Sequence, residues 1–99
     1  MDEMLRAISN YPNGTYLQIE WADAGVILGG VIDTIYQTNN GCPESASGFR
    51  EYYVCAFRLK DIIKNTSGNA YNANSLMEIS MEAPPTAITL RDDELVWKA

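Results

Sequence analysis

The chain contains no histidine, and this single absence removes several chemistries. Serine–histidine–aspartate and cysteine–histidine catalysis, histidine-ligated zinc and imidazole acid–base chemistry all require that ring. With only two cysteines, Cys42 and Cys55, the sequence cannot form a four-cysteine metal site. It has no EF-hand spacing for calcium and no phosphate-binding loop, because Gly29-Gly30 is not followed by Lys-Ser or Lys-Thr. We therefore expect no catalytic residues, no cofactor and no bound metal.

Long hydrophobic runs are absent as well. No apolar stretch is long enough to span a bilayer, so we expect no membrane contact. The first residues, MDEMLRAISNYP, have neither the basic start nor the apolar centre of a signal peptide, which predicts a cytoplasmic protein. Thiols are reduced by default in that compartment, but the residues alone leave open whether Cys42 and Cys55 form a disulfide.

Basic residues are scarce, because seven Lys and Arg face thirteen Asp and Glu and the formal net charge is −6. An acidic field of this kind repels nucleic-acid phosphates and attracts basic partners. The charge is uneven: residues 50–64 carry four basic side chains against two acidic ones, whereas Asp92-Asp93-Glu94 is the densest acidic cluster. We interpret that cluster as a solvated turn, since Asp is a preferred turn residue. The expected partner is a basic protein and not a nucleic acid.

Apolar residues recur at two different spacings in the first third of the chain, which predicts a short helix followed by strands. In residues 1–10, the spacing of one helix face is kept by four apolar residues: Met1, Met4, Leu5 and Ile8. In residues 15–36, apolar and polar residues alternate, which is typical of two strands joined by a turn. The Gly29-Gly30 pair inside the second strand is typical of a bulge or a sharp bend. We therefore predict a curved hairpin over 15–36.

Further strands are predicted in the second half. Residues 50–59 form a strand that is apolar on both faces, so it is central or is covered by the N-terminal helix or a partner protein. Residues 59–64, LKDIIK, fit either a helical turn or an extension of this strand. Ser80 is expected to point outward. The C-terminal strands lie within 76–97, with these side chains inward: Met77, Ile79, Met81, Ile88, Leu90, Leu95 and Trp97.

Together these elements predict a single, mainly β domain over residues 1–99. Its composition, 46% hydrophobic and 20% charged, is ordinary for a globular protein. The expected architecture is a small, strongly curved antiparallel sheet of five or six strands, or an SH3/Sm-like barrel, with one short N-terminal helix. The sequence leaves the strand order and the oligomeric state open.

The order of a helix, a glycine and five strands resembles the Sm-like small barrel. Four segments in the first third of the chain follow that family's first motif: Leu5-x-x-Ile8, Gly14, Leu17-x-Ile19-x-Trp21 and Gly25-x4-Gly30-x-Ile32. The family's next Asp aligns with Tyr36 and its Asn with Asn40, while Leu90-Arg91-Asp92 lacks the glycine of the second motif. The resemblance implies a curled small barrel and, as an alternative function, an oligomer that binds RNA.

The leading functional hypothesis is a non-enzymatic, acidic protein-interaction domain. Its concrete form is an immunity or inhibitor protein that blocks a basic toxin or nuclease, because acidic charge speeds encounter with a basic partner and exposed tyrosines anchor interfaces. The candidate partner-binding residues are Tyr16, Glu20, Tyr52, Asp92, Asp93 and Glu94. Two alternatives stay open: an Sm-like oligomeric RNA-binding protein and, least favoured, an enzyme that uses carboxylates or a divalent metal.

Overall fold

The computed structural model describes residues 2–38 and 52–99. The expectations for Met1, Cys42, the connection between the second and third strands, and the first two residues of the predicted 50–59 strand lie outside these ranges. One helix and six strands follow one another along the described chain: α1 (Glu3–Ile8), β1 (Tyr16–Trp21), β2 (Val26–Thr38), β3 (Tyr52–Asn65), β4 (Leu76–Ile79), β5 (Ala87–Leu90) and β6 (Leu95–Lys98).

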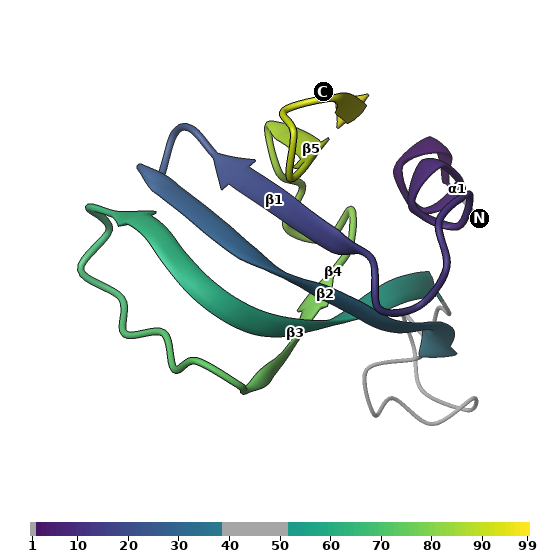
Figure 1. Cartoon of the computed structure of the whole chain (residues 1–99), viewed down its shortest axis with the longest axis horizontal. Helices are drawn as coiled ribbons and strands as arrows, with labels where there is room; N and C mark the ends of the chain where they lie inside the picture. Colours follow the sequence, from purple (N-terminus) through teal and green to yellow (C-terminus); the bar gives the residue numbers. More distant parts are fainter. Residues whose placement is uncertain (1, 39–51) are drawn as a thin grey trace, which may run out of the picture.

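The six strands form one antiparallel sheet in the order β4-β3-β2-β1-β5-β6. The first four strands follow one another as a meander, and the chain then returns to place β5 beside β1 (Figure 1). Among the described residues, β4 and β6 are the two edges of the sheet. The prediction of a mainly β, strongly curled sheet with one short N-terminal helix is therefore confirmed.

The sheet curls because β2 and β3 are long and their pairing is interrupted. These strands contain 13 and 14 residues, and their register shifts at three points, one of them between Gly29 and Gly30. Such irregularities bend a strand and increase its twist. A Cβ atom at Gly30 would lie 2.2 Å from the carbonyl oxygen of Arg58, so the close approach of the two backbones requires glycine. Residues 59–64 extend β3, so LKDIIK is strand and not helix.

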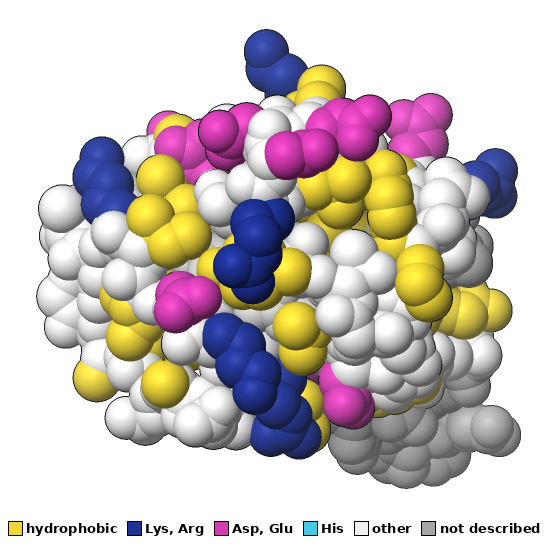
Figure 2. All heavy atoms as spheres, in the orientation of Figure 1, with side chains coloured by type: hydrophobic (Ala, Val, Ile, Leu, Met, Phe, Trp, Pro, Cys, Tyr) yellow, Lys and Arg dark blue, Asp and Glu magenta, His cyan; other side chains and the backbone are white. Residues whose placement is uncertain are grey.

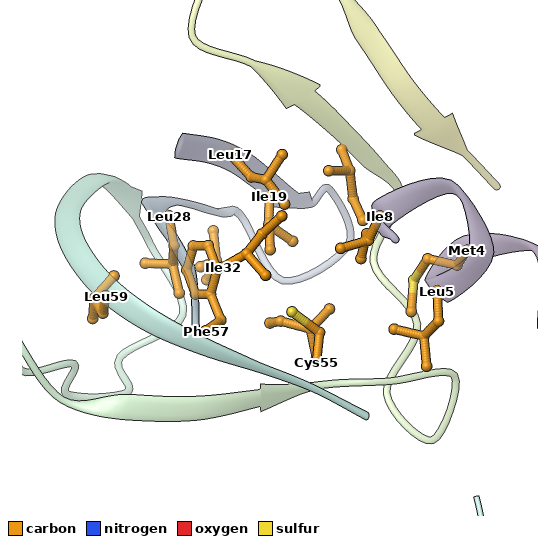
Figure 3. Close-up of a cluster of buried hydrophobic side chains, with 13 residues drawn as sticks. Met4, Leu5, Ile8, Leu17, Ile19, Leu28, Ile32, Cys55, Phe57 and Leu59 are labelled. Carbon is orange, nitrogen blue, oxygen red and sulfur yellow. The ribbon is translucent and has the colours of Figure 1, made fainter. Parts of the chain in front are cut away.

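The concave side of the sheet holds the hydrophobic core, which α1 closes at one end (Figures 1 and 3). Asp2 caps the helix by accepting a hydrogen bond of 2.9 Å from the Leu5 backbone N–H. Phe57 is fully buried at the centre of β3. Around it lie side chains from the helix and three strands, namely Met4, Leu5, Ile8, Leu17, Ile19, Leu28, Ile32, Cys55 and Leu59. A helix of six residues depends on such packing, because it is too short to be stable alone.

The third strand is buried on both faces between Val54 and Phe57, as its apolar sequence predicts. The helix packs with Cys55 on the core side. On the other side, Tyr36 lies opposite Val54 and Glu78 lies opposite Ala56. The Tyr36 hydroxyl donates a 2.5 Å hydrogen bond to Glu78 Oε2, so this pair spans the second face of β3.

Three side chains in the C-terminal half face the opposite way from the prediction. Ser80 is buried with 8% of its surface exposed, and Met81 is 43% exposed, because β4 ends at Ile79 and the alternation does not continue into the following turn. Leu95 is 56% exposed. A register shift between β5 and β6 places it opposite Thr89, whose side chain points away from the core.

Candidate partner-binding face

Alternation along β1 creates an outer face that points away from the core. Leu17 and Ile19 are fully buried, so Tyr16, Gln18 and Glu20 lie on the opposite side of the strand. Antiparallel partners share a face. The face therefore continues onto the neighbouring strands through the residues opposite Gln18 and Glu20, which are Thr89 and Ala87 on β5 and Gly29 and Ile27 on β2.

A hollow of about 200 Å³ lies on this face, and we call it the outer hollow. On the β5 side, Gln18 and Glu20 are flanked by the smaller side chains of Thr89 and Ala87. The residues that line it are Gln18, Glu20, Ile27, Ala87, Thr89 and Asp93. Its rim thus carries two carboxylates, whereas Ile27 and Ala87 supply apolar surface.

Tyr16 is fixed beside the outer hollow by contacts from both sides. Its hydroxyl donates a 2.8 Å hydrogen bond to Asp61 Oδ2, and the Arg91 guanidinium carbon lies 3.9 Å from the ring centroid. A Cβ atom at Gly29 would lie 1.9 Å from the Tyr16 hydroxyl oxygen, so the glycine makes room for the ring to reach across β2. Partial burial and the bond to Asp61 raise the pKa of Tyr16. The ring therefore stays neutral and is held in place.

The turn between β5 and β6 carries the acidic cluster. Asp92, Asp93 and Glu94 are all exposed, and Asp92 Oδ1 accepts a 3.1 Å hydrogen bond from the Glu94 backbone N–H. Asp93 has a positive φ of 67° and lines the outer hollow. Asp92 and Arg91, with Tyr16 and Leu90, line a second and wider hollow of about 540 Å³. Figure 2 shows Asp and Glu side chains along the upper edge of the view, where the C-terminal strands lie.

The structure therefore places four of the six predicted partner-binding residues at the two hollows. Tyr16, Glu20, Asp92 and Asp93 line the two adjoining hollows, and Glu94 belongs to the same turn. Tyr52 is half-buried at the start of β3, opposite Thr38, and lines neither hollow. We call Glu20, Asp92, Asp93 and Glu94 the acidic side of the outer face.

Sequence reasoning missed the neighbours that shape this face. The alternation along β1 already indicated that Gln18 shares a face with Tyr16 and Glu20. The contributions of Thr89, Asp61 and Arg91 depend on strand register, which no local pattern reveals.

Three described basic residues of β3 make up what we call the basic side: Arg58, Lys60 and Lys64. Arg58 Nη1 donates a 2.8 Å hydrogen bond to the carbonyl oxygen of Asn74, and Lys60 Nζ donates one of 3.2 Å to Asn74 Oδ1. Asn74 itself has a positive φ of 69°. Two of the three basic groups thus hold the loop that leads into β4.

Cys55 is free and buried. Burial and the negative charge of Asp33 raise the pKa of the Cys55 thiol to about 12, so it stays protonated and unreactive. Within residues 2–38 and 52–99, no three Cys, Asp or Glu side chains are placed to hold a metal ion. Nor does this part of the chain contain a helix with the length and hydrophobicity needed to cross a membrane.

Comparison with known protein families identifies an immunity protein, a class that acts by binding a toxin. The family described as "Cognate immunity protein YxxD" matches residues 1–99, and the chain belongs to this family. The match covers every element of the fold and both sides of the outer face. No curated protein and no solved structure matches the chain. A cognate immunity protein has a protein partner, the toxin, and the outer face is the candidate surface for it.

Proposed function

We propose that this immunity protein neutralises a toxin with a basic surface by binding it, without catalysis and in the cytoplasm, through the acidic side of the outer face. The observation that carries the proposal is the convergence of Glu20, Asp92 and Asp93 around two hollows beside a fixed tyrosine. Family membership supports the toxin as partner. The charge of that toxin and the site of contact are our inference.

Electrostatics and packing supply different parts of the binding energy in this proposal. The formal net charge of −6 and the exposed acidic turn attract a basic toxin and speed its encounter. Tyr16 then offers a ring whose position is already set by Asp61 and Arg91, so little conformational freedom is lost when it is covered. Tyrosine in such a setting is a typical interface anchor.

Family membership favours this proposal over the two alternatives. An Sm-like RNA-binding role would need basic residues free to meet phosphates, yet Arg58 and Lys60 hold Asn74. A carboxylate enzyme would need acidic groups that are buried or coupled to one another. In the described chain the acidic cluster instead lies at an exposed turn.

The test uses association kinetics with the cognate toxin at several salt concentrations. The variant Asp92→Asn/Asp93→Asn/Glu94→Gln removes three charges from the acidic side without changing side-chain shape. We expect its association rate to fall about tenfold, with a weaker salt dependence, because steering is lost. Asp93→Asn suits a positive φ, and the amide introduced by Asp92→Asn keeps an acceptor oxygen for the backbone N–H of position 94, so the fold should remain intact.

The matched control is Glu3→Gln/Asp23→Asn/Asp33→Asn, which removes three exposed charges elsewhere on the molecule. We expect its association rate to change by less than about twofold, since only the net charge differs. Equal rates for the two triple variants, or no change in either, would show that the toxin does not use the acidic side.

A further inference from the structure

We infer that the outer hollow receives one long basic side chain, lysine or arginine, from the toxin. This inference rests on the proposed function, because the toxin is the partner that would supply the side chain. It adds to that proposal a specific contact, made by a built hollow and separate from the general attraction of the acidic turn.

The size of the hollow suits a single side chain. Its volume is about 200 Å³, which is below the ~300–1,000 Å³ usual for pockets that hold whole small molecules. It lies over the centre of a paired sheet, where β1 is hydrogen-bonded to both β2 and β5. Five of its six lining residues therefore lie on paired strands, and Asp93 comes from the β5–β6 turn.

The chemistry of the lining suits a side chain that is apolar along its stem and positive at its tip. Ile27 and Ala87 offer apolar surface to the methylene groups, as lysine and arginine stems require. Glu20 and Asp93 offer carboxylates from two separate elements, β1 and the β5–β6 turn. A charge-assisted hydrogen bond to a carboxylate is roughly twice as strong as a neutral one.

Acceptors for the remaining donors are also present. The Gln18 side-chain carbonyl and the Thr89 hydroxyl line the same hollow, and they lie opposite each other across β1 and β5. An ammonium group has three donors and a guanidinium has five, so a cation lowered between the carboxylates needs such additional partners. These groups limit the cost of removing the cation from water.

The two carboxylates are available for a partner. Within residues 2–38 and 52–99, neither the Glu20 nor the Asp93 side chain has a hydrogen-bond or ion-pair partner. Two lysines lie two strands away from Glu20 in register: Lys98 beyond Ala87, and Lys64 beyond Ile27. Asp61, by contrast, is engaged by Tyr16.

A titration without toxin tests the hollow directly. The full-length, ¹⁵N-labelled protein is titrated with N-acetyl-lysine methylamide and, separately, with N-acetyl-arginine methylamide, while backbone amide shifts are followed by NMR. Matched neutral compounds are the Nε-acetyl-lysine and citrulline analogues. We expect saturable shifts at Glu20, Thr89 and Asp93 with the basic compounds only, with dissociation constants on the order of millimolar. The tighter of the two basic compounds identifies the preferred side chain.

Two variants separate this contact from general charge attraction. Glu20→Gln/Asp93→Asn should weaken binding of the basic compound about tenfold, whereas Asp23→Asn/Asp33→Asn, with the same change in net charge, should alter it less than about twofold. Ala87→Leu fills the hollow and keeps every charge. This variant should also weaken binding about tenfold, because the leucine side chain occupies the space that the methylene stem of the basic compound would fill.

Several results would overturn the inference: no saturable shift at the lining residues, equal binding of neutral and basic compounds, or undiminished binding in either hollow variant. The same Ala87→Leu protein is then measured with the toxin, where we expect faster dissociation. If the toxin binds it normally, the inference fails while the proposed function stands. If instead the three-charge variant of the β5–β6 turn associates normally, the proposed function fails regardless of the titration.

Discussion

The acidic and basic sides of the outer face use their charges in different ways. On the basic side, Arg58 and Lys60 donate hydrogen bonds to Asn74 and hold the loop before β4. On the acidic side, Glu20 and Asp93 line a hollow and have no such partner among the described residues. The sign of a charged patch therefore matters less for recognition than whether its charges already have partners within the fold. Charges without internal partners are the ones available for recognition.

The two sides meet at Tyr16. Its ring comes from β1, on the acidic side, and its hydroxyl reaches Asp61 on β3, on the basic side. Gly29 lies beneath the ring and Gly30 bends the sheet beside it. Substitutions of Tyr16, Gly29 or Gly30 should therefore disturb both sides. Substitutions within one side should leave the other unchanged.

The largest effect is expected from Gly30→Ala. A Cβ atom would meet the Arg58 carbonyl oxygen at 2.2 Å and the Phe57 ring at 2.7 Å. Neither backbone nor buried ring can move aside cheaply, so we expect a loss of about 3 kcal/mol in the free energy of unfolding. Urea denaturation measures it. A loss below about 1 kcal/mol would mean that the two strands can separate without cost.

Gly29→Ala should cost less, although its Cβ would lie only 1.9 Å from the Tyr16 hydroxyl oxygen. That oxygen is the far end of a side chain that can swing toward solvent. We expect a loss of about 1–2 kcal/mol, from the bond to Asp61 and the contact with Arg91. Denaturation of Gly29→Ala and Gly30→Ala in parallel provides the comparison. Equal losses would contradict a movable ring.

Within the basic side, Arg58→Gln should lower stability by about 1 kcal/mol, because the carbonyl of Asn74 loses a charged donor. Within the acidic side, Glu20→Gln should change it by less than about 0.5 kcal/mol, since its carboxylate has no partner to lose among the described residues. Hydrogen exchange of the 66–75 amides reports whether the loop loosens in the Arg58 variant alone. A comparable loss in both variants would remove the distinction between the two sides.

The smallest effect concerns pH. Since the folded state raises the pKa of Tyr16 above its usual value of 10.0, the stabilisation is complete below about pH 10 and is lost as the pH rises through the folded pKa. The stability difference between the parent and Tyr16→Phe should therefore shrink at alkaline pH. Tyr36, whose pKa is also raised by Glu78, is present in both proteins and cancels. A difference independent of pH up to about pH 11 would mean that folding does not raise the pKa of Tyr16.

Sequence patterns predicted the structural features that depend only on residues close together in the chain. Alternation placed Tyr16 and Glu20 on one face, and the paired glycines marked the bend in β2. Contacts that depend on strand register could not be predicted from the sequence. A shift of one residue in the register moves every following side chain to the other face of the sheet. Leu95 shows this: it was expected in the core, but the shift in β6 turns it outward. The Asp61 and Arg91 contacts to Tyr16 join distant segments, and no spacing in the sequence encodes them.

The last residues of β3 extend beyond its pairing with β4, and this affects how the protein behaves at high concentration. Pairing with β4 covers only Cys55 to Arg58, and in the described chain no strand borders residues 60–65 on that side. This stretch exposes Ile62 and Ile63, and an uncovered apolar strand is a template for aggregation. Lys60 and Lys64 flank the two isoleucines and act as gatekeepers, because stacking copies of this edge would bring like charges together. We therefore expect Lys60 and Lys64 to keep copies of the protein from pairing along this edge of β3.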